Sequence, residues 1–359
     1  MNAHVQPVCR HFGTCGGCTW QDMPPREYAA FKRGLVVDAL TQHGLADATV
    51  AELAETGPAT RRRAVFKATK EGGVVRLGFY AARSHTIVDM EECHVLTAAL
   101  VRLVTGLRGM LAELLHERES AELHVTEAVN GFDLSWHGKR KPDALFAAVV
   151  ARWAQKLGLA RITAAGEAVI VLREPYVTFS AAQVHLPPEV FLQASHEGES
   201  ILQTLVLAGI GRSKHVIDLF AGVGTFALPL AGVARVHAVD SDSAALDALL
   251  AAARATQKLK PVTVEKRDLF KLPVADAELR RFDAAVLDPP RTGASAQAKS
   301  LAKSSLSRIV YVSCNPQSFA RDARSLTDGG YRMGTVTPID QFLWSSHIEL
   351  VAAFSRDRT

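Results

Sequence analysis

The stretch that decides the fold is "HVIDLFAGVGTFALPLA", His215–Ala231. A strand-forming run is followed by a turn with two glycines, Gly222 and Gly224, and then by an apolar helix-forming run. Glycines in a strand-to-helix turn let the backbone approach a ligand closely. An isolated Gly-x-Gly more often only makes a tight turn, and the spacing departs from the dinucleotide fingerprint because Phe226 and Ala227 follow.

Strand-like and helical segments alternate on both sides of this turn. The strand-like runs downstream are "VARVHAVDSD", "VTVEKRDLF", "FDAAVLDPPR" and "SRIVYVSCNP". Such alternation predicts a parallel sheet with right-handed crossovers. We therefore expect an α/β chain in which a doubly wound, Rossmann-like domain at 189–359 follows an α+β domain at 1–188.

The first half of the chain has a different sequence pattern. Helical spacing predicts helices, and alternation or a Gly-Gly pair at 72–73 predicts strands and a hairpin. The expected helices are 26–43, 95–117 and 144–157, and the expected strands lie within 61–88, 121–137 and 161–180.

Acidic residues stand at the ends of successive predicted strands. Asp240 lies about twenty residues after the glycine turn, where an acid accepts hydrogen bonds from ribose hydroxyls. Asp268 and Asp288 follow the third and fourth strands, and Asp218 precedes the turn. Each alone could be a helix cap. No phosphate-cradling loop is present, so together they favour a ligand with a ribose, an adenine and a cationic centre, such as S-adenosylmethionine.

A cysteine ends the fifth predicted strand, in "VYVSCNPQSF". A free cysteine is often a small buried hydrophobe. Asn315 and Pro316 stop the strand, however, and this should leave Cys314 at the ligand-binding edge. A thiolate there would be a strong nucleophile.

The other four cysteines are Cys9, Cys15 and Cys18, spaced Cys-x5-Cys-x2-Cys, and the distant Cys93. The N-terminus lacks an apolar segment typical of a signal peptide, which predicts a cytoplasmic protein with reduced thiols. Four thiols suit zinc or an iron–sulfur cluster, and the spacing leaves both open. His11 and His94 are alternative ligands, although His94 should point away if its segment is extended.

Composition sets broad limits. The chain has 359 residues, a net charge of +4 and a pI of about 8.8. This charge permits a nucleic-acid partner without requiring one. No apolar run is long enough to span a membrane. We also expect the protein to be a monomer.

The segments "DLFAGVGTF", "LDPPRTG", "YVSCNPQSFARD" and "SSHIELV", with "VFLQAS" upstream, together resemble the RNA (uracil-5-)-methyltransferase family. The resemblance implies S-adenosylmethionine-dependent methylation of uridine carbon 5, with Cys314 as nucleophile and Glu349 as base. Asp288 and Arg291 would hold cofactor and substrate. The expected cofactor contacts are Gln193, Phe220, Gly222, Gly224, Asp240, Asp268 and Asp288.

The cysteine-rich start resembles the [4Fe-4S] site of the 23S ribosomal RNA branch, which assigns Cys9, Cys15, Cys18 and Cys93 to a cluster. Because this site is far in sequence from Cys314, we expect a structural or RNA-positioning role. Several relatives have an N-terminal OB-type barrel, which we expect this chain to lack because the sequence starts almost at the cysteine cluster. Two basic runs are candidate phosphate contacts: Arg61, Arg62, Arg63 and Lys67, and Lys139, Arg140 and Lys141.

Three alternatives remain open. The RNA could be transfer RNA. The enzyme could instead methylate cytosine, but a cytosine-5 enzyme usually carries its nucleophile after a proline, whereas Cys314 follows Ser313. Finally, the chain could be a non-catalytic iron–sulfur RNA-binding protein, although every position that the chemistry needs is filled.

Overall fold

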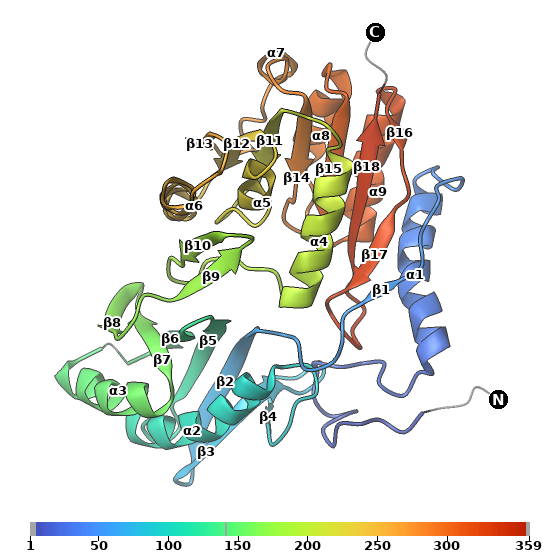
Figure 1. Cartoon of the computed structure of the whole chain (residues 1–359). Helices are drawn as coiled ribbons and strands as arrows, with labels where there is room; N and C mark the ends of the chain where they lie inside the picture. Colours follow the sequence, from blue (N-terminus) through green and yellow to red (C-terminus); the bar gives the residue numbers. More distant parts are fainter. Residues whose placement is uncertain (1–4, 141, 357–359) are drawn as a thin grey trace.

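The computed structural model describes residues 5–140 and 142–356. Within them the chain forms two large sheets and one small hairpin (Figure 1). The first sheet has the strand order β4-β3-β2-β5-β6-β7-β8. The second has the order β1-β17-β18-β15-β14-β11-β12-β13, and β16 pairs with β18.

The first sheet has helices packed on one face, with a common apolar core between them. The predicted helices and the hairpin at Gly72 and Gly73, both with positive φ, are confirmed. The region predicted as strands at 161–180 forms parts of two separate pairs, β7 with β8 and β9 with β10. The bounds are β2 Arg63–Glu71, β3 Val74–Tyr80, β4 Ile87–Asp89, α2 Ala98–Leu114, β5 Ser120–Ala128, β6 Gly131–Gly138, α3 Ala144–Lys156, β7 Leu159–Ala164, β8 Glu167–Val171, β9 Tyr176–Phe179 and β10 Ala182–His185.

The second sheet is doubly wound, as predicted. Its parallel strands are β11 His215–Leu219, β12 Arg235–Asp240, β13 Val262–Lys266, β14 Ala284–Leu287 and β15 Arg308–Ser313. Helices α4 His196–Gly209, α5 Ala227–Ala231 and α6 Ser243–Ala255 cover one face. Helices α1 Pro25–Gln42, α7 Asp276–Leu279, α8 Ser295–Lys303 and α9 Pro316–Asp328 cover the other. Strand β18 Glu349–Ser355 is antiparallel to β15, and β16 Arg332–Met333 and β17 Thr337–Asp340 pair with β18.

Residues 25–55, from the first half of the chain, also contribute to the layer built on the second sheet. Strand β1 (Ala54–Glu55) pairs in parallel with β17, and α1 packs near α9. Lys32 of α1 and Asp340 of β17 form a fully buried ion pair with a 2.7 Å separation between Nζ and Oδ1. The sheets therefore do not follow the predicted boundary between 188 and 189, because long-range pairing brings residues 25–55 to the second layer.

No helix in the described part of the chain is long and apolar enough to cross a membrane.

Candidate active site and cysteine pocket

The glycine turn after β11 uses its two glycines differently. Phe220 and Gly222 have φ of +62° and +52°. A Cβ added at Gly222 would meet nothing within 4 Å, so this backbone is open to a ligand. A Cβ at Gly224, with φ of +95°, would lie 2.8 Å from Leu249 Cγ. Gly224 is therefore needed for the packing of the turn against α6.

The acids near the turn have separate environments. Asp240 accepts hydrogen bonds from the backbone N–H groups of Gly222 at 2.8 Å and Asp242 at 2.9 Å, which ties the end of β12 to the turn. Asp268 is more exposed and accepts from the N–H of Phe270 at 3.0 Å. Asp218 is fully buried inside β11, and burial, with the charges of Asp288 and Asp240, raises its pKa well above the usual range.

The sheet brings Cys314 and Glu349 together. Ser313 of β15 is paired with Leu350 of the antiparallel β18, so the next position in this register sets Cys314 beside Glu349. Asn315 caps α9 by accepting from the N–H of Gln317, which ends the strand and leaves the thiol half-buried. The expected position of Cys314 at the sheet edge is thus what the fold produces.

Burial disfavours the charged forms of the Cys314 thiol and the Glu349 carboxyl group. Burial, followed by the charges of Glu349 and Asp288, raises the pKa of the Cys314 thiol to about 12, and Arg291 acts in the opposite direction. Burial and the charge of Asp288 raise the pKa of Glu349 well above its usual range. Burial also raises the pKa of Asp288 to about 7. Three ionisable groups therefore share one poorly solvated space.

A chain of buried amides links these two carboxyl groups. Gln193 Nε2 donates to Asp288 Oδ2 at 2.9 Å. Gln341 Nε2 donates to Gln193 Oε1 at 2.8 Å and to Glu349 Oε2 at 2.7 Å. Sequence reasoning found Gln193 but missed Gln341. The signal available was its place directly after a strand and eight residues before Glu349.

The predicted phosphate contact in the arginine run is wrong for Arg62. Arg62 is buried, where it pairs with Glu199 and donates to the carbonyl of Gln193. Arg63 donates to the carbonyl of Leu192 at 2.6 Å. These arginines brace the segment that carries Gln193, because its carbonyl groups need donors once the segment is buried.

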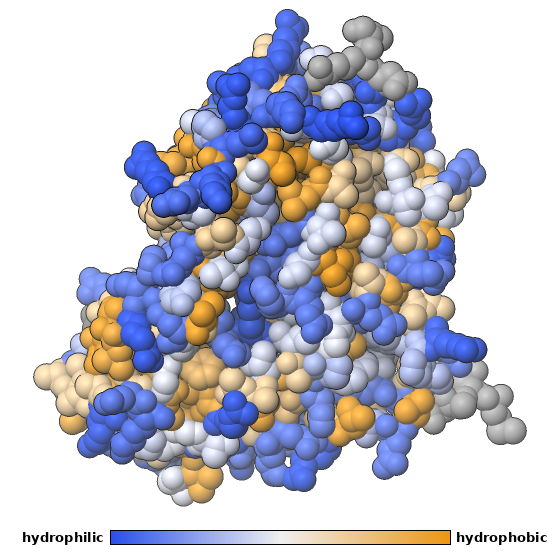
Figure 2. Space-filling model, viewed as in Figure 1, coloured by the Kyte–Doolittle hydropathy of each residue, from blue (hydrophilic) through white to orange (hydrophobic). Residues whose placement is uncertain are grey.

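Most of the other residues in the two predicted basic runs also have hydrogen-bond or ion-pair partners. Arg61 is partly buried and donates to the carbonyl of Arg63, and Lys67 pairs with Glu122. Arg140 contacts Asp143 and the carbonyl of Leu114, while Lys139 is exposed. Lys141 lies outside the described residues. Figure 2 shows polar residues around a recess in the middle of the molecule, between the parts built on the two sheets.

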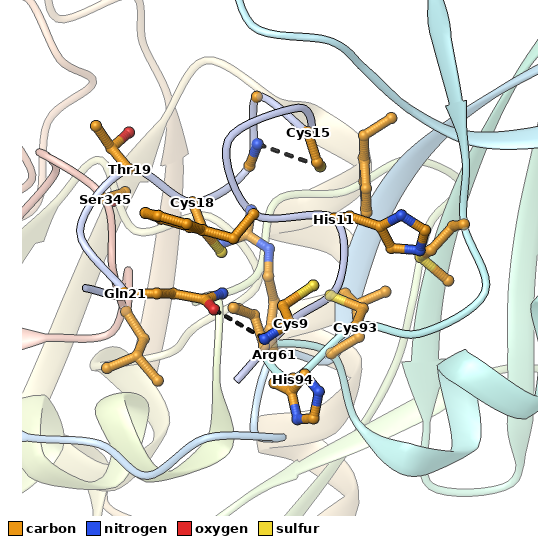
Figure 3. A pocket seen from close by; sticks show the side chains of 18 of the residues that line it. Cys9, His11, Cys15, Cys18, Thr19, Gln21, Arg61, Cys93, His94 and Ser345 are labelled. Carbon is orange, nitrogen blue, oxygen red and sulfur yellow. Dashed lines mark hydrogen bonds between the residues drawn. The ribbon is translucent and has the colours of Figure 1, made fainter. Parts of the chain in front are cut away.

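Cys9, Cys15, Cys18 and Cys93 line one pocket of about 400 Å³ (Figure 3). His94 lines it too, and its segment is not a regular strand, so the condition under which we expected it to point away is not met. The pocket is also lined by the 342–347 loop. The N–H groups of Thr19 and Trp20 donate to the carbonyl of Trp344 in that loop, so the pocket adjoins the segment leading to Glu349 despite the distance in sequence.

The four thiols of this pocket are soft donors that suit zinc or an iron–sulfur cluster. Burial, together with the neighbouring thiols, raises the pKa of Cys18 to about 12, so ionisation of the set calls for a cation. Zinc bound at about 2.3 Å would draw four sulfurs to roughly 3.8 Å from one another. Among the described residues, no three of these sulfurs lie within 4.8 Å of one another. The group that meets this distance is His124, His137 and Glu189, in which His137 already bonds Glu189 and His124 bonds Glu122.

Comparison with known proteins places the chain in a family. The family model described as tRNA (Uracil-5-)-methyltransferase matches residues 189–356. An uncharacterised RNA methyltransferase of Agrobacterium fabrum is 45% identical over 357 residues, which cover 98% of this chain and 86% of the relative. The 23S rRNA (uracil(1939)-C(5))-methyltransferase of Aeromonas salmonicida is 30% identical over 369 residues, covering 98% of this chain and 83% of that protein.

The fold agrees with this assignment. The structure of Pyrococcus abyssi tRNA (uracil-54, C5)-methyltransferase in complex with S-adenosyl-L-homocysteine superposes with a TM-score of 0.73 at 21% identity. The match covers 94% of this chain and 85% of the archaeal chain. The chain therefore belongs to the RNA (uracil-5-)-methyltransferase family and is an S-adenosylmethionine-dependent RNA methyltransferase.

Proposed function

We propose that this enzyme methylates carbon 5 of a uridine in 23S ribosomal RNA through a covalent adduct with Cys314. The observation that carries the proposal is the placement of Cys314 beside Glu349, on neighbouring strands at the edge that also holds the glycine turn. A thiol and a carboxyl group at one sheet edge supply the nucleophile and the base that this chemistry needs.

The sulfur of Cys314 attacks carbon 6 of the uracil, and the electron pair of the carbon 5–carbon 6 double bond moves to form an enolate. Bound S-adenosylmethionine would supply the methyl group that carbon 5 takes, with the methyl–sulfur bond breaking and S-adenosylhomocysteine as the leaving group. The carboxylate of Glu349 then removes the carbon 5 proton. The electrons of that C–H bond restore the double bond, the bond between carbon 6 and sulfur breaks, and Cys314 leaves as a thiolate.

The raised pKa of Cys314 has a consequence for the first step. The thiol is protonated in the free enzyme near neutral pH, so its proton must leave as sulfur attacks. Asp288, with a pKa of about 7, is partly ionised there and is the acceptor that we assign. Arg291 favours the thiolate by its positive charge.

The choice of ribosomal RNA rests on the resemblance of the cysteine-rich start and on the similarity to the Aeromonas enzyme. Transfer RNA is the second candidate, favoured by the description of the family model and by the Pyrococcus neighbour. Total RNA from a deletion strain, incubated with the enzyme and mapped for new 5-methyluridine, separates them. A product in 23S RNA supports the proposal, and one confined to transfer RNA replaces it with the alternative.

For the cofactor we propose contacts at Gln193, Phe220, Gly222, Gly224, Asp240, Asp268 and Asp288. The open Gly222 is one support, and the position of Asp240 at the end of β12 is another.

Asp240→Ala is expected to weaken S-adenosylmethionine binding by about 1.5 to 3 kcal/mol, the size of lost hydrogen bonds to a charged group. The substitution also frees the N–H of Gly222, which Asp240 holds. Calorimetric titration measures the change. Asp242→Ala is the matched control, because Asp242 caps α6 through its side chain and should affect stability more than affinity. Equal affinities for Asp240→Ala and the unmodified enzyme would remove Asp240 from the site.

We further propose that Cys9, Cys15, Cys18 and Cys93 hold a [4Fe-4S] cluster. The four thiols line one pocket, and this supports the proposal. When bound, the cluster would supply four iron–sulfur bonds that tie the N-terminal loop to Cys93. Because the same pocket is lined by the 342–347 loop, these cysteines would also support the segment that precedes Glu349.

Protein purified without air is expected to contain about four iron atoms per chain and to be brown, as a cubane with four thiolates requires. Cys15→Ser should lose the iron. Cys314→Ser is the control for loss of a thiol elsewhere and should keep it. One zinc per chain without visible absorbance would exclude the cluster.

A further inference from the structure

Gln341 lies between the two carboxyl groups of the active site and is 3% exposed. It follows directly after β17, which ends at Asp340. Its Nε2 atom lies 2.7 Å from Glu349 Oε2 and 2.8 Å from Gln193 Oε1. Its Oε1 atom lies 3.2 Å from the backbone N of Ala194.

The backbone fixes which way the amide of Gln341 points. The N–H of Ala194 can only donate, so the atom of Gln341 that faces it must be the oxygen. The NH₂ group then faces Gln193 and Glu349, and each of its two hydrogens has an acceptor. Gln193 is oriented in turn, because its oxygen accepts from Gln341 while its own NH₂ group donates to Asp288.

The linked amides of Gln193 and Gln341 present an N–H donor to a carboxyl group at each end. An ionised carboxylate only accepts hydrogen bonds, and both Asp288 and Glu349 receive an amide N–H. The amides thus favour the charged form of two acids that burial, and for Glu349 also the charge of Asp288, push toward the neutral form.

We propose that Gln341 is a positioning residue for the base: it holds the carboxylate of Glu349 in one orientation, favours its ionised form, and links it to Gln193 and Asp288. The proposal rests on the proposed function, in which Glu349 removes the carbon 5 proton. It goes further by assigning the group that keeps Glu349 competent to accept a proton.

The other groups around Glu349 do not favour its ionised form, so this role falls to Gln341. Asp288 at the end of β14 and Cys314 at the end of β15 both oppose a second negative charge. Arg291 is positive but acts on Cys314. The remaining nearby charges are engaged elsewhere: Arg62 pairs with Glu199, Lys32 pairs with Asp340, and the pKa of His347 is lowered, chiefly by burial.

The sign of the expected pH effect follows from this. Removing the donor disfavours the charged form, so the pKa of Glu349 rises further and a smaller fraction is ionised at a given pH. The acid limb of the elimination step should therefore move to higher pH, by about one to two pH units for a lost hydrogen bond to a charged group. Nucleophilic attack by Cys314 should be affected less.

The test uses Gln341→Met, which keeps the length of the side chain and removes its donors. The enzyme is mixed with saturating S-adenosylmethionine carrying a labelled methyl group and with an RNA that the unmodified enzyme methylates. Formation and release of the covalent RNA adduct are followed on denaturing gels from pH 6 to pH 9. The expected result is normal formation of a methylated adduct, slow release at neutral pH, and recovery of release at higher pH.

Gln297→Met is the matched control. Gln297 is also buried, at 1% exposure, but within the described residues its amide bonds the backbone of Val274 instead of a carboxyl group. It should lose stability without a shift of the release midpoint. If Gln341→Met does not fold, Gln341→Ser, which leaves room for a donating water, should show a smaller shift in the same direction.

A release midpoint for folded Gln341→Met or Gln341→Ser equal to that of the unmodified enzyme would overturn the proposal. Failure of the underlying function looks different. In that case no adduct forms with the unmodified enzyme or with Glu349→Gln, whatever residue occupies position 341.

Discussion

Glu349→Gln enzyme is expected to accumulate a protein–RNA species that survives denaturation and carries the labelled methyl group. Glutamine keeps the shape of Glu349 but cannot take the carbon 5 proton. Attack and methyl transfer proceed, and elimination stalls, slowed by about 10²- to 10⁴-fold as expected for loss of a general base. The species is measured as a shifted, labelled band on a denaturing gel.

Cys314→Ala should fail at the earlier step. Without the sulfur no adduct forms and no methyl group is transferred, because carbon 5 is not activated. The labelled band of Glu349→Gln should disappear in the double variant with Cys314→Ala. Normal turnover by Glu349→Gln, or methylation of uridine by Cys314→Ala, would show that the proposed mechanism is wrong.

Lys32→Met is expected to lower the free energy of unfolding by roughly 3 to 5 kcal/mol, since it leaves Asp340 as a buried charge without its partner. Both members of this pair have fully buried side chains. Lys32 also donates to the carbonyl groups of Phe342 and His347, so the loop before Glu349 loses support as well. Urea denaturation followed by fluorescence measures the change.

Lys67→Met provides the comparison. Lys67 pairs with Glu122 in a more exposed site, with side chains 20% and 35% exposed, so its loss should cost no more than about 1 kcal/mol. Similar losses for the two variants would mean that the Lys32 pair contributes no more than a surface pair. Adding Asp340→Asn to Lys32→Met should recover part of the stability, because the uncompensated charge is then removed.

The strand–turn–helix segments could be predicted because their signals are local. Gly222, Asp240 and Cys314 each stand at a strand end that the apolar pattern already marks. The placement of Cys314 beside Glu349 required more, because it depends on β18 returning antiparallel to β15. Only the resemblance to a family suggested that pair before the structure showed its register.

Other parts could not be predicted because their partners are distant or their burial is not visible in the sequence. Gln341 meets Gln193 across 148 positions, and its place after a strand does not show that its side chain is buried. In the sequence, Arg62 belongs to a basic run that is typical of surface charge. In the structure it is buried and pairs with Glu199, which lies 137 positions away. A run of charges gives no information about which members find a buried partner.

The participation of β1 in the second sheet has a consequence for how the protein is made. Ala54 pairs with Ile339, and Lys32 can form its buried ion pair only after Asp340 has been synthesised. At about 5 to 20 residues per second, roughly 15 to 60 s of translation separate these partners. During that time α1 cannot dock, and its lysine must remain hydrated while the residues between β1 and β17 are synthesised. The edge of the second sheet is therefore completed late, after the ribosome has delivered β15, the strand that precedes Cys314.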